Sequence, residues 1–223
     1  MAATVLITGA NRGIGKEMAT QAAKAGWQVI GTARDPGAVS DFDGALHALD
    51  VRSEEGHANL AKALDGQAID LLVCNAGIYP ARGGLDAPGA TAEAFSDAML
   101  THVAGPFFAA RAFLENLKAA PAPKIAIISS RMGSNAAAQG NGLVYRASKA
   151  AATNLASNLA VALRPEGIAV GAYHPGWVRT DLGGSDADVS VEDSAKGLWE
   201  RFAALSLDTS GVFESYDGAP LAF

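Results

Sequence analysis

Short apolar runs alternate with longer alanine-rich segments along the whole chain, and this alternation is what most constrains the fold. Polar and apolar residues do not alternate within the runs, so we expect strands buried on both faces, as in a parallel sheet. The sequence therefore predicts an α/β chain with a single Rossmann-type domain over residues 1–223, whose doubly wound parallel sheet of about seven strands carries helices on both faces. The expected strands cover residues 5–8, 27–32, 46–50, 69–75, 125–129, 168–173 and 212–216.

The segments between the runs carry helix signals. Ser53 can cap a helix that begins with two glutamates, and Ser190 with Asp193 fits a capping box before another helix. Loops 78–90 and 181–190 are rich in Gly, Pro and Asp, and each follows a predicted strand. Because ligands bind outside the carboxyl ends of strands in open α/β sheets, both loops are expected to border the substrate.

Bulk composition excludes several classes of protein. The 223 residues carry a net charge of −6 and show no basic cluster interleaved with aromatics, which argues against a nucleic-acid partner. The single cysteine, Cys74, lies in an apolar run and leaves no basis for a disulfide framework or a metal site. No apolar run approaches the ~18 residues of a membrane span, and residues 5–8 read as fold rather than signal peptide. A cytoplasmic location without a membrane partner is therefore expected.

The segment T-G-A-N-R-G-I-G at residues 8–15 stands between the first predicted strand and the first predicted helix. Its glycines permit a tight turn and let backbone N–H groups approach a pyrophosphate, while the helix N-terminus adds a favourable partial charge. In a chain with 25 glycines the pattern alone is weak, and its position gives it weight. The predicted cofactor-binding residues here are Gly9, Asn11, Arg12, Gly13, Ile14 and Gly15.

The second predicted strand is followed by Ala33 and Arg34, where an NAD enzyme would place a carboxylate against the ribose 2′-hydroxyl. Together with Arg12, Arg34 could bind a 2′-phosphate through bidentate hydrogen bonds. We therefore expect NADP(H) to be the preferred cofactor. Two alternatives stay open: both arginines could be solvated surface charges, or Asp35 could face the ribose if the loop shifts by two residues, which keeps NAD(H) possible.

Tyr145 and Lys149 lie four residues apart in Y-R-A-S-K, on one face of a helix predicted over about residues 145–164. Moving a phenol pKa from about 10 to about 7 takes about 4 kcal/mol, and a lysine charge about 4 Å away could nearly supply it. Ser130 follows the fifth predicted strand and could hold a substrate oxygen. The hypothesis is that NADPH gives a hydride to a carbonyl carbon while Tyr145 gives its proton to the oxygen. Considered alone, Y-x-x-x-K could equally be an exposed helix pair.

These motifs resemble those of the short-chain dehydrogenase/reductases, in order and spacing, over essentially the whole chain. Within that family, the segments R-M-G-S, H-P-G-W-V-R-T-D-L-G-G and S-G-V-F-E-S-Y-D-G are most similar to the C-factor and sniffer-like carbonyl reductases. The resemblance implies a small-molecule carbonyl or alcohol substrate and a homodimer formed through helices over residues 92–117 and 145–163. The matching residues are the glycine loop, Asp50-Val51, Asn75-Ala76-Gly77, Ser130, Tyr145, Lys149 and Pro175-Gly176-x-Val178-x-Thr180.

The resemblance also implies roles for the matching residues. Asp50 would bind the adenine amine with Val51 packed nearby, and residues 75–77 would support the sheet and the adenine ribose. Lys149 would hold the nicotinamide ribose hydroxyls beside Tyr145. The residues implied at the nicotinamide end of the cofactor are Pro175, Gly176, Val178 and Thr180. From the bare sequence, residues 75–77 could be only a turn and Thr180 only a helix cap.

The sequence departs from the family pattern at His102. The family commonly carries an asparagine there, within V-N-x-x-G, which holds a water that relays protons to the lysine. This chain reads T-H-V-A-G at residues 101–105. A neutral imidazole can donate and accept, so His102 could serve the relay and add a titration near pH 6–7. It could also merely fill the space, or catalysis could be impaired.

The remaining histidines and aromatics carry weaker expectations. His47 and His57 are expected at the surface, and His174 is expected to orient the cofactor loop. Because the segment after Thr180 is short, we expect an open substrate end that accepts broad or bulky substrates. Tyr79 is expected on one wall of it, and Trp177 either on a wall or in the core.

Two functions of different class remain. The first is an NADP(H)-dependent reductase of aldehydes or ketones. The second is a signalling or redox-sensing protein that binds NADP(H) with little turnover, which the C-factor resemblance suggests. A signalling chain has no need to keep Ser130, Tyr145 and Lys149 together, which favours the enzyme. An epimerase or dehydratase of the extended fold is disfavoured because about forty residues follow Thr180.

Overall fold

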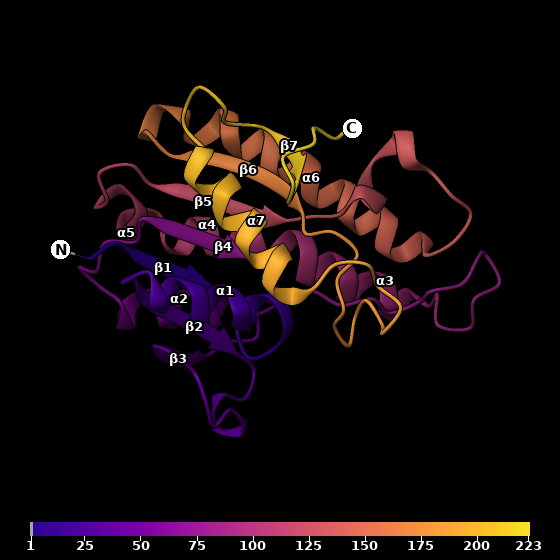
Figure 1. Ribbon diagram of the computed structural model, residues 1–223, viewed down its shortest axis with the longest axis horizontal. Helices are drawn as coiled ribbons and strands as arrows, with labels where there is room; N and C mark the ends of the chain where they lie inside the picture. Colours follow the sequence, from indigo (N-terminus) through magenta and orange to yellow (C-terminus); the bar gives the residue numbers. More distant parts are fainter. Residues whose placement is uncertain (1) are drawn as a thin grey trace.

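The computed structural model describes residues 2–223 and contains one seven-stranded sheet flanked by helices (Figure 1). All strand pairs are parallel, in the order β3-β2-β1-β4-β5-β6-β7. The predicted doubly wound α/β fold is confirmed, and every strand end lies within two residues of its predicted position. The strands are β1 (Thr4–Ile7), β2 (Gln28–Ala33), β3 (Ala45–Ala48), β4 (Leu71–Cys74), β5 (Lys124–Ile128), β6 (Ala169–His174) and β7 (Phe213–Ser215).

Both predicted helix caps are confirmed. The Ser53 hydroxyl accepts a hydrogen bond from the backbone N–H of Gly56 at 2.9 Å, and that of Ser190 accepts one from Asp193 at 3.0 Å. The helices are α1 (Gly13–Lys24), α2 (Glu54–Ala63), α3 (Ala92–Met99), α4 (Gly105–Ala112), α5 (Leu114–Lys118), α6 (Leu143–Leu163) and α7 (Val191–Ala204).

The alternating direction of strand side chains divides the core between two layers. Val5 and Ile7 of β1 pack on one face with Met18 of α1 and Leu198 of α7. Leu6, between them, belongs to the layer on the other face, which α2, α4, α5 and α6 cover. Figure 1 shows α7 crossing one face of the sheet. Each large apolar side chain contributes about 1.5–3 kcal/mol to the free energy of folding when it is fully buried. The two layers together therefore hold the sheet and its helices in place.

Two expectations about regular structure were wrong. β3 is an edge strand that pairs only with β2, and none of its residues is buried, although burial on both faces was predicted. The helix expected over residues 92–117 is divided by a π turn at Leu100–Ala104 and again at Phe113. Pro106 accounts for the π turn, because it has no N–H for the carbonyl of His102 and its ring crowds that carbonyl. The N–H of Gly105 bonds instead to the carbonyl of Leu100, five residues back.

The strand order sets the place of a ligand site. β1 lies between β2 and β4 in the sheet. The chain adds β2 and β3 on one side of β1 and then crosses to add β4 on the other side. This reversal opens a crevice at the carboxyl ends of β1 and β4. The glycine loop follows β1, and the loops after β4, β5 and β6 end at the same edge of the sheet (Figure 1). All of the predicted site motifs therefore converge on one edge.

Candidate active site

The glycine loop between β1 and α1 has the geometry that a phosphate group requires. Gly9 and Gly13 adopt positive φ angles of 66° and 53°. A Cβ on Gly15 would collide with the carbonyl oxygen of Gly9. No side chain caps the first N–H groups of α1, and no acidic residue lies in its first turn. These donors and the positive end of the helix fit the pyrophosphate of a dinucleotide.

Asn75 ties this loop to β4. Its side-chain amide donates to the carbonyl oxygens of Thr8 and Gly9, both at 3.0 Å, and the Thr8 hydroxyl accepts from the backbone N–H groups of Asn75 and Ala76. A Cβ on Gly9 would lie 2.9 Å from the Cα of Ala76. Residues 75–77 therefore form a brace, a hydrogen-bonded support for the glycine loop. They are more than the simple turn that the sequence alone allowed.

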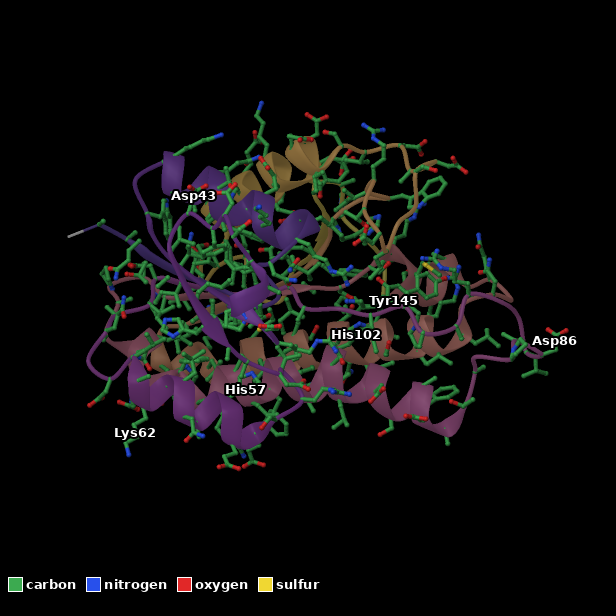
Figure 2. The ribbon with its side chains drawn as sticks, turned by 90° about the horizontal axis from the view of Figure 1, so that it is seen from below. Asp43, His57, Lys62, Asp86, His102 and Tyr145 are labelled. Atoms are coloured by element: carbon green, nitrogen blue, oxygen red, sulfur yellow. The ribbon has the colours of Figure 1, made fainter. Side chains whose placement is uncertain are left out.

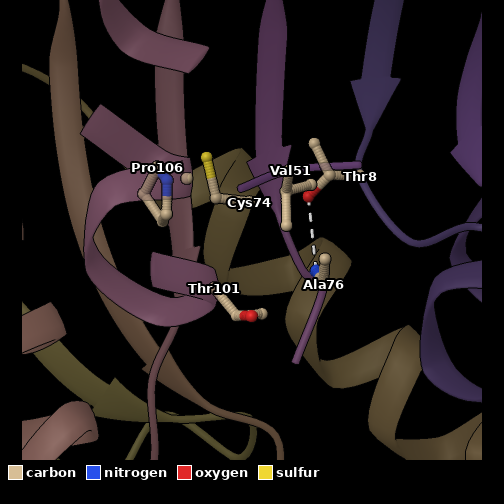
Figure 3. Close-up of a pocket in the computed structure, with 7 residues that line it drawn as sticks. Thr8, Val51, Cys74, Ala76, Thr101 and Pro106 are labelled. Atoms are coloured by element: carbon tan, nitrogen blue, oxygen red, sulfur yellow. Dashed lines mark hydrogen bonds between the residues drawn. The ribbon is translucent and has the colours of Figure 1, made fainter. Parts of the chain in front are cut away.

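A small cavity lies beside this brace (Figure 3). It has a volume of about 10 Å³, which is the size of one water molecule, and so it cannot admit part of a dinucleotide. Cys74 lines it, and burial raises the pKa of that thiol to about 12, which makes the cysteine unreactive as expected. Its other lining residues include Thr8, Val51, Ala76 and Thr101.

Asp50, which the family resemblance would place against the adenine, is held by an arginine that the sequence analysis did not single out. Arg52 donates to both carboxylate oxygens of Asp50, from Nε at 3.0 Å and from Nη2 at 2.7 Å, and it also pairs with Asp97 at 2.9 Å. The pKa of Asp50 is held below its usual value, first by Arg52 and also by the charge of Arg34. Asp50 thus stays ionised, the state that accepts a hydrogen bond from an adenine amine. The arginine directly after the Asp50-Val51 pair was the available signal.

The two arginines expected to bind a 2′-phosphate lie differently. Arg34 follows β2 directly, is exposed and forms no ion pair with any residue of 2–223. Arg12, at the start of α1, pairs across the cleft with Asp181, with 2.6 Å between Nη1 and Oδ2. Asp35 begins a short 3₁₀ turn at Pro36–Ala38 and is exposed. No local sequence pattern predicts the contact between Arg12 and Asp181, because the two residues lie 169 positions apart.

Tyr145 and Lys149 lie in the first two turns of α6 and are both buried. The Lys149 ammonium donates to the carbonyl oxygen of Ile128 at 2.8 Å and stands 5.6 Å from the centre of the Tyr145 ring. Ser130 follows β5 and is also buried. The structure thus brings the three predicted polar residues together at the carboxyl end of β5.

The electrostatics of this corner correct one expectation. Burial raises the pKa of Tyr145 to about 12, although the neighbouring Ser130 hydroxyl lowers it, so Lys149 does not bring the phenol near neutrality here. Burial also lowers the pKa of Lys149 to about 7. The physical reason is that desolvation penalises the charged form of both groups and outweighs a lysine whose ammonium is bonded to Ile128 rather than to the phenol. Without ligands, Tyr145 is a neutral proton donor.

Close packing fixes Ser130 against α6. The Ser130 hydroxyl accepts from the N–H of Met132 and begins the turn Arg131–Gly133. A Cβ on Gly133 would lie 2.6 Å from the backbone of Lys149, so this position needs glycine. Ser129, the other serine of I-S-S, points the opposite way and donates to the carbonyl of Lys149 at 3.0 Å. The β5 end and α6 therefore form one rigid corner.

The segment after β6 lies against the glycine loop. Gly176 has a φ of 90° and would clash with Tyr216 if it carried a side chain. A Cβ on Gly13 would lie 3.3 Å from the Thr180 methyl group. Ser194 of α7 holds the carbonyl of Pro175 at 2.6 Å, and Val178 is buried. Residues 175–180 thus border the glycine loop and are held by α7.

Two loops form walls around the phenol. The Tyr79 ring stacks on Tyr145 with 4.3 Å between ring centres and 19° between planes. Arg82 covers the Tyr79 ring at 4.7 Å and donates to the carbonyl of Leu182 at 2.6 Å, which joins the loops 78–90 and 181–190. Trp177 is half exposed, so it is not a core residue.

The histidines differ from expectation. His57 is fully buried rather than at the surface, because its Nδ1 bonds to the carbonyl of Ser53 and its ring packs beside Phe108 under α4. Burial lowers the pKa of His174 to about 4, so it carries no charge near neutrality. His102 is also buried, in the π turn, and lies next to Tyr145 (Figure 2). Its low pKa, about 2, overturns the expected titration near pH 6–7, and burial is the main cause.

Within residues 2–223, no helix is both long and apolar enough to cross a membrane. No group of three or more His, Cys, Asp and Glu side chains in that range is arranged to hold a metal ion.

Sequence comparison agrees with this geometry. Residues 3–189 match the family described as short chain dehydrogenase. The C-signal of Myxococcus xanthus is 35% identical over 157 residues, which cover 67% of this chain and 90% of that protein. The 3-oxoacyl-[acyl-carrier-protein] reductase FabG of Escherichia coli (strain K12) is 32% identical over 188 residues, which cover 79% of this chain and 74% of that protein.

Structure comparison points to reductases. The carbonyl reductase Sniffer of D. melanogaster aligns with a TM-score of 0.90 at 27% identity over the whole of both chains. An NADPH-bound carbonyl reductase from chicken fatty liver aligns with a TM-score of 0.88 at 31% identity, covering 100% of this chain and 99% of that chain.

Proposed function

The chain belongs to the short-chain dehydrogenase family of oxidoreductases, and from that premise we propose that it is an NADP(H)-dependent carbonyl reductase. It interconverts an aldehyde or ketone with the corresponding alcohol. The observation that carries the proposal is the burial of Ser130, Tyr145 and Lys149 in one rigid corner, at the sheet edge where the glycine loop begins. Burying three polar side chains costs free energy, which favours a chemical role for them.

The roles follow from the state of each group. When bound, the nicotinamide cofactor supplies the hydride for the carbonyl carbon. Tyr145, protonated because its pKa is raised to about 12, donates its proton to the carbonyl oxygen. The Ser130 hydroxyl, adjacent to the phenol, donates a hydrogen bond to the same oxygen as charge develops there. Lys149 stabilises the phenolate that remains, since its ammonium lies 5.6 Å from the ring centre.

NADP(H) preference is part of the proposal. It is supported by the exposed Arg34 at the end of β2, where a carboxylate would serve an NAD enzyme, and by Arg12 at the start of α1. The NADPH-bound carbonyl reductase from chicken fatty liver, at 31% identity, gives it further weight. Asp35 stays a competing ribose partner, because it is exposed two residues after the strand ends.

A homodimer is also inferred. The helices α3 and α4 expose Phe95, Met99 and Phe107 on their surface. Apolar side chains gathered on one outer helix pair support burial against a second copy. The face belongs to the segment that the sequence reading had assigned to the dimer.

The second candidate function is signalling through bound NADP(H) with little turnover. The 35% identity to the C-signal of Myxococcus xanthus is the observation that favours it. The two candidates differ in one measurable property, because a signalling protein would bind the cofactor without consuming it.

The deciding experiment is a panel of aliphatic and aromatic aldehydes, ketones and alcohols with NADPH or NADP⁺, followed by nicotinamide absorbance. We expect reduction of several bulky carbonyls, aromatic ones included, because Tyr79 and Trp177 wall an otherwise open end. Tyr145→Phe should lower kcat at least ~10²-fold, since it removes the proton donor. Cofactor binding without turnover of any carbonyl would select the signalling function, and sharp rejection of aromatic carbonyls would contradict the predicted substrate range.

A further inference from the structure

His102 occupies the widest turn of its helix and faces the catalytic helix. It is 2% exposed and lies in the π turn Leu100–Ala104 that Pro106 imposes. Figure 2 shows it beside Tyr145, and the two rings meet edge to face, with 5.6 Å between centres and 90° between planes. Widened turns of this kind occur frequently at functional sites.

Both ring nitrogens of His102 are engaged, and their partners fix the tautomer. The backbone N–H of Ile78 donates to Nε2 at 3.1 Å. Since a backbone amide can only donate, Nε2 carries no proton, and a neutral ring must carry it on Nδ1. Nδ1 lies 2.9 Å from the Ser148 hydroxyl, which in turn donates to the carbonyl oxygen of Tyr145 at 2.8 Å. A chain of hydrogen bonds therefore runs from Ile78 through His102 and Ser148 to Tyr145.

The charges around the ring keep it neutral. Burial is the largest cause of the low pKa of His102, and the Lys149 charge acts in the same direction. The hydrogen bond that Nε2 accepts from Ile78 also favours the neutral ring, because protonation of Nε2 would break it. The other titratable side chain that packs on the ring is Tyr145, which is itself neutral. A ring with one proton and two satisfied nitrogens has neither a lone pair nor an N–H left for a relayed water.

The chain of hydrogen bonds ends where the substrate is held. Ile78 directly precedes Tyr79, whose ring stacks on Tyr145. The same loop bonds to the start of α6, where the N–H of Gly142 donates to the carbonyl of Gly83 at 2.8 Å. A Cβ on Gly77 would stand 3.4 Å from Nε2, so the imidazole packs closely against the N-A-G turn. The loop is thus attached to the catalytic helix on both sides of Tyr79.

We propose that His102 is a positioning residue for the substrate wall and not a member of a proton relay: it ties the Ile78 amide to the turn of α6 that carries Tyr145, and so sets the Tyr79–Tyr145 stack. A residue that acts in this way changes how the substrate is held, whereas a relay residue changes how protons move. The activity part of the test rests on the proposed carbonyl reductase function.

Two substitutions separate the two halves of the imidazole. A glutamine carbonyl reaches the place of Nε2 and can accept from Ile78, whereas an asparagine amide reaches only the place of Nδ1 and keeps the Ser148 contact. Asparagine is the residue that the family carries here, so a relay role favours His102→Asn. The positioning role favours His102→Gln, because this variant still accepts the hydrogen bond from Ile78. In His102→Asn the Ile78 amide has no acceptor, and the loop is released from α6.

In the activity measurement, His102→Asn should raise KM for a bulky carbonyl about tenfold, with KM for NADPH unchanged, and His102→Gln should recover most of the loss. The pH profile of kcat should keep the wild-type shape in both variants. Loss of fold alone would lower kcat and thermal stability without this split. An Asn variant equal to or better than wild type, a Gln variant no better than Asn, or a shifted pH profile would each overturn the proposal.

A second measurement needs no turnover, so it keeps the proposal testable if the reductase function fails or a variant does not fold. Nitrogen-15 NMR of wild-type His102 should show a neutral ring protonated on Nδ1 that does not titrate between pH 5 and 9. The Ile78 amide should be protected from hydrogen exchange in wild type and His102→Gln and unprotected in His102→Asn. A titrating ring, or a freely exchanging Ile78 amide in the wild type, would overturn the proposal.

Discussion

The catalytic corner and the phosphate corner of this molecule are built on opposite principles. At the catalytic corner, Tyr145 and Lys149 are 8% and 4% exposed; a backbone carbonyl holds the Lys149 ammonium, and the Tyr145 ring stacks on Tyr79. At the phosphate corner, the side chains of Arg12 and Asp181 are 65% and 80% exposed, and they are held by each other. The first corner is buried and fixed by packing, whereas the second is exposed to solvent.

The difference matches what each corner has to do. A group that stabilises developing charge works best when its orientation is fixed before the reaction, because no reorganisation is then needed. A group that selects one cofactor over another needs only to bind the preferred cofactor more tightly, and it can stay solvated until that cofactor binds. Substitutions at the catalytic corner should therefore have large effects on turnover and stability. Those at the phosphate corner, whose exposed rim carries Arg12, Arg34 and Asp181, should have smaller effects that depend on the cofactor.

The largest effect is expected from Lys149→Met. The ammonium next to the Tyr145 ring is lost, so kcat for carbonyl reduction should fall by about 10²–10³-fold, an electrostatic loss of about 3–4 kcal/mol. Lys149→Arg is the control for the charge alone. It keeps the positive charge, but its guanidinium is too large for the buried site in which the Lys149 ammonium donates to Ile128. A Met variant with near wild-type kcat would show that the buried ammonium is not part of the chemistry.

The same variant should be more stable than the wild type, and the gain should depend on pH. Burial lowers the folded-state pKa of Lys149 from 10.5 to about 7, so the unfolded chain binds the extra proton between those values. The penalty is complete below about pH 7 and disappears as pH rises towards 10. We expect Lys149→Met to raise the free energy of unfolding by about 2–4 kcal/mol at pH 6, after the lost bond to Ile128 is allowed for. Thermal melts from pH 6 to pH 10 measure this, and a constant difference would contradict it.

Arg34→Asp, at the rim, is expected to have an intermediate effect. The substitution replaces a guanidinium with the carboxylate that suits a ribose 2′-hydroxyl, so the ratio of kcat/KM with NADPH to that with NADH should fall about 10–100-fold. The pKa of Asp50 should also rise, because Arg34 is one of the charges that lower it. Arg34→Gln is the matched control, which removes the charge without adding one. An unchanged ratio would assign cofactor selection to another residue, of which Arg12 is the first candidate.

The sequence predicted most of the fold because its signals are local. The apolar runs, the Ser53 and Ser190 caps and the glycine loop each depend on neighbours within a few positions, and each is confirmed. What failed depended on tertiary surroundings. His57 looks like a surface residue until α4 is packed over it, and the pKa of Tyr145 follows from total burial rather than from its spacing to Lys149.

The candidate site shows the same division. Tyr145, Lys149 and Ser130 could be chosen from motif and order alone. The Arg12–Asp181 pair and the stacking of Tyr79 on Tyr145 join segments more than sixty residues apart, so no local pattern announces them. The π turn had a local cause in Pro106, which the helical reading of residues 92–117 overlooked.

The smallest effect is expected from Asp181→Asn, and it tests the rim most directly. Asp181 competes with a 2′-phosphate for Arg12, so its neutralisation should lower KM for NADPH by about two- to threefold, the scale of an exposed ion pair. KM for NADH should not change, since that cofactor brings no phosphate to Arg12. Added salt should remove the difference, because it screens both partners. Asp186→Asn, in the same loop and without an arginine partner among residues 2–223, is the control. An equal fall in KM for both cofactors would mean that Asp181 acts on the conformation of its loop and not on Arg12. The phosphate corner would then be fixed before the cofactor binds, as the catalytic corner is.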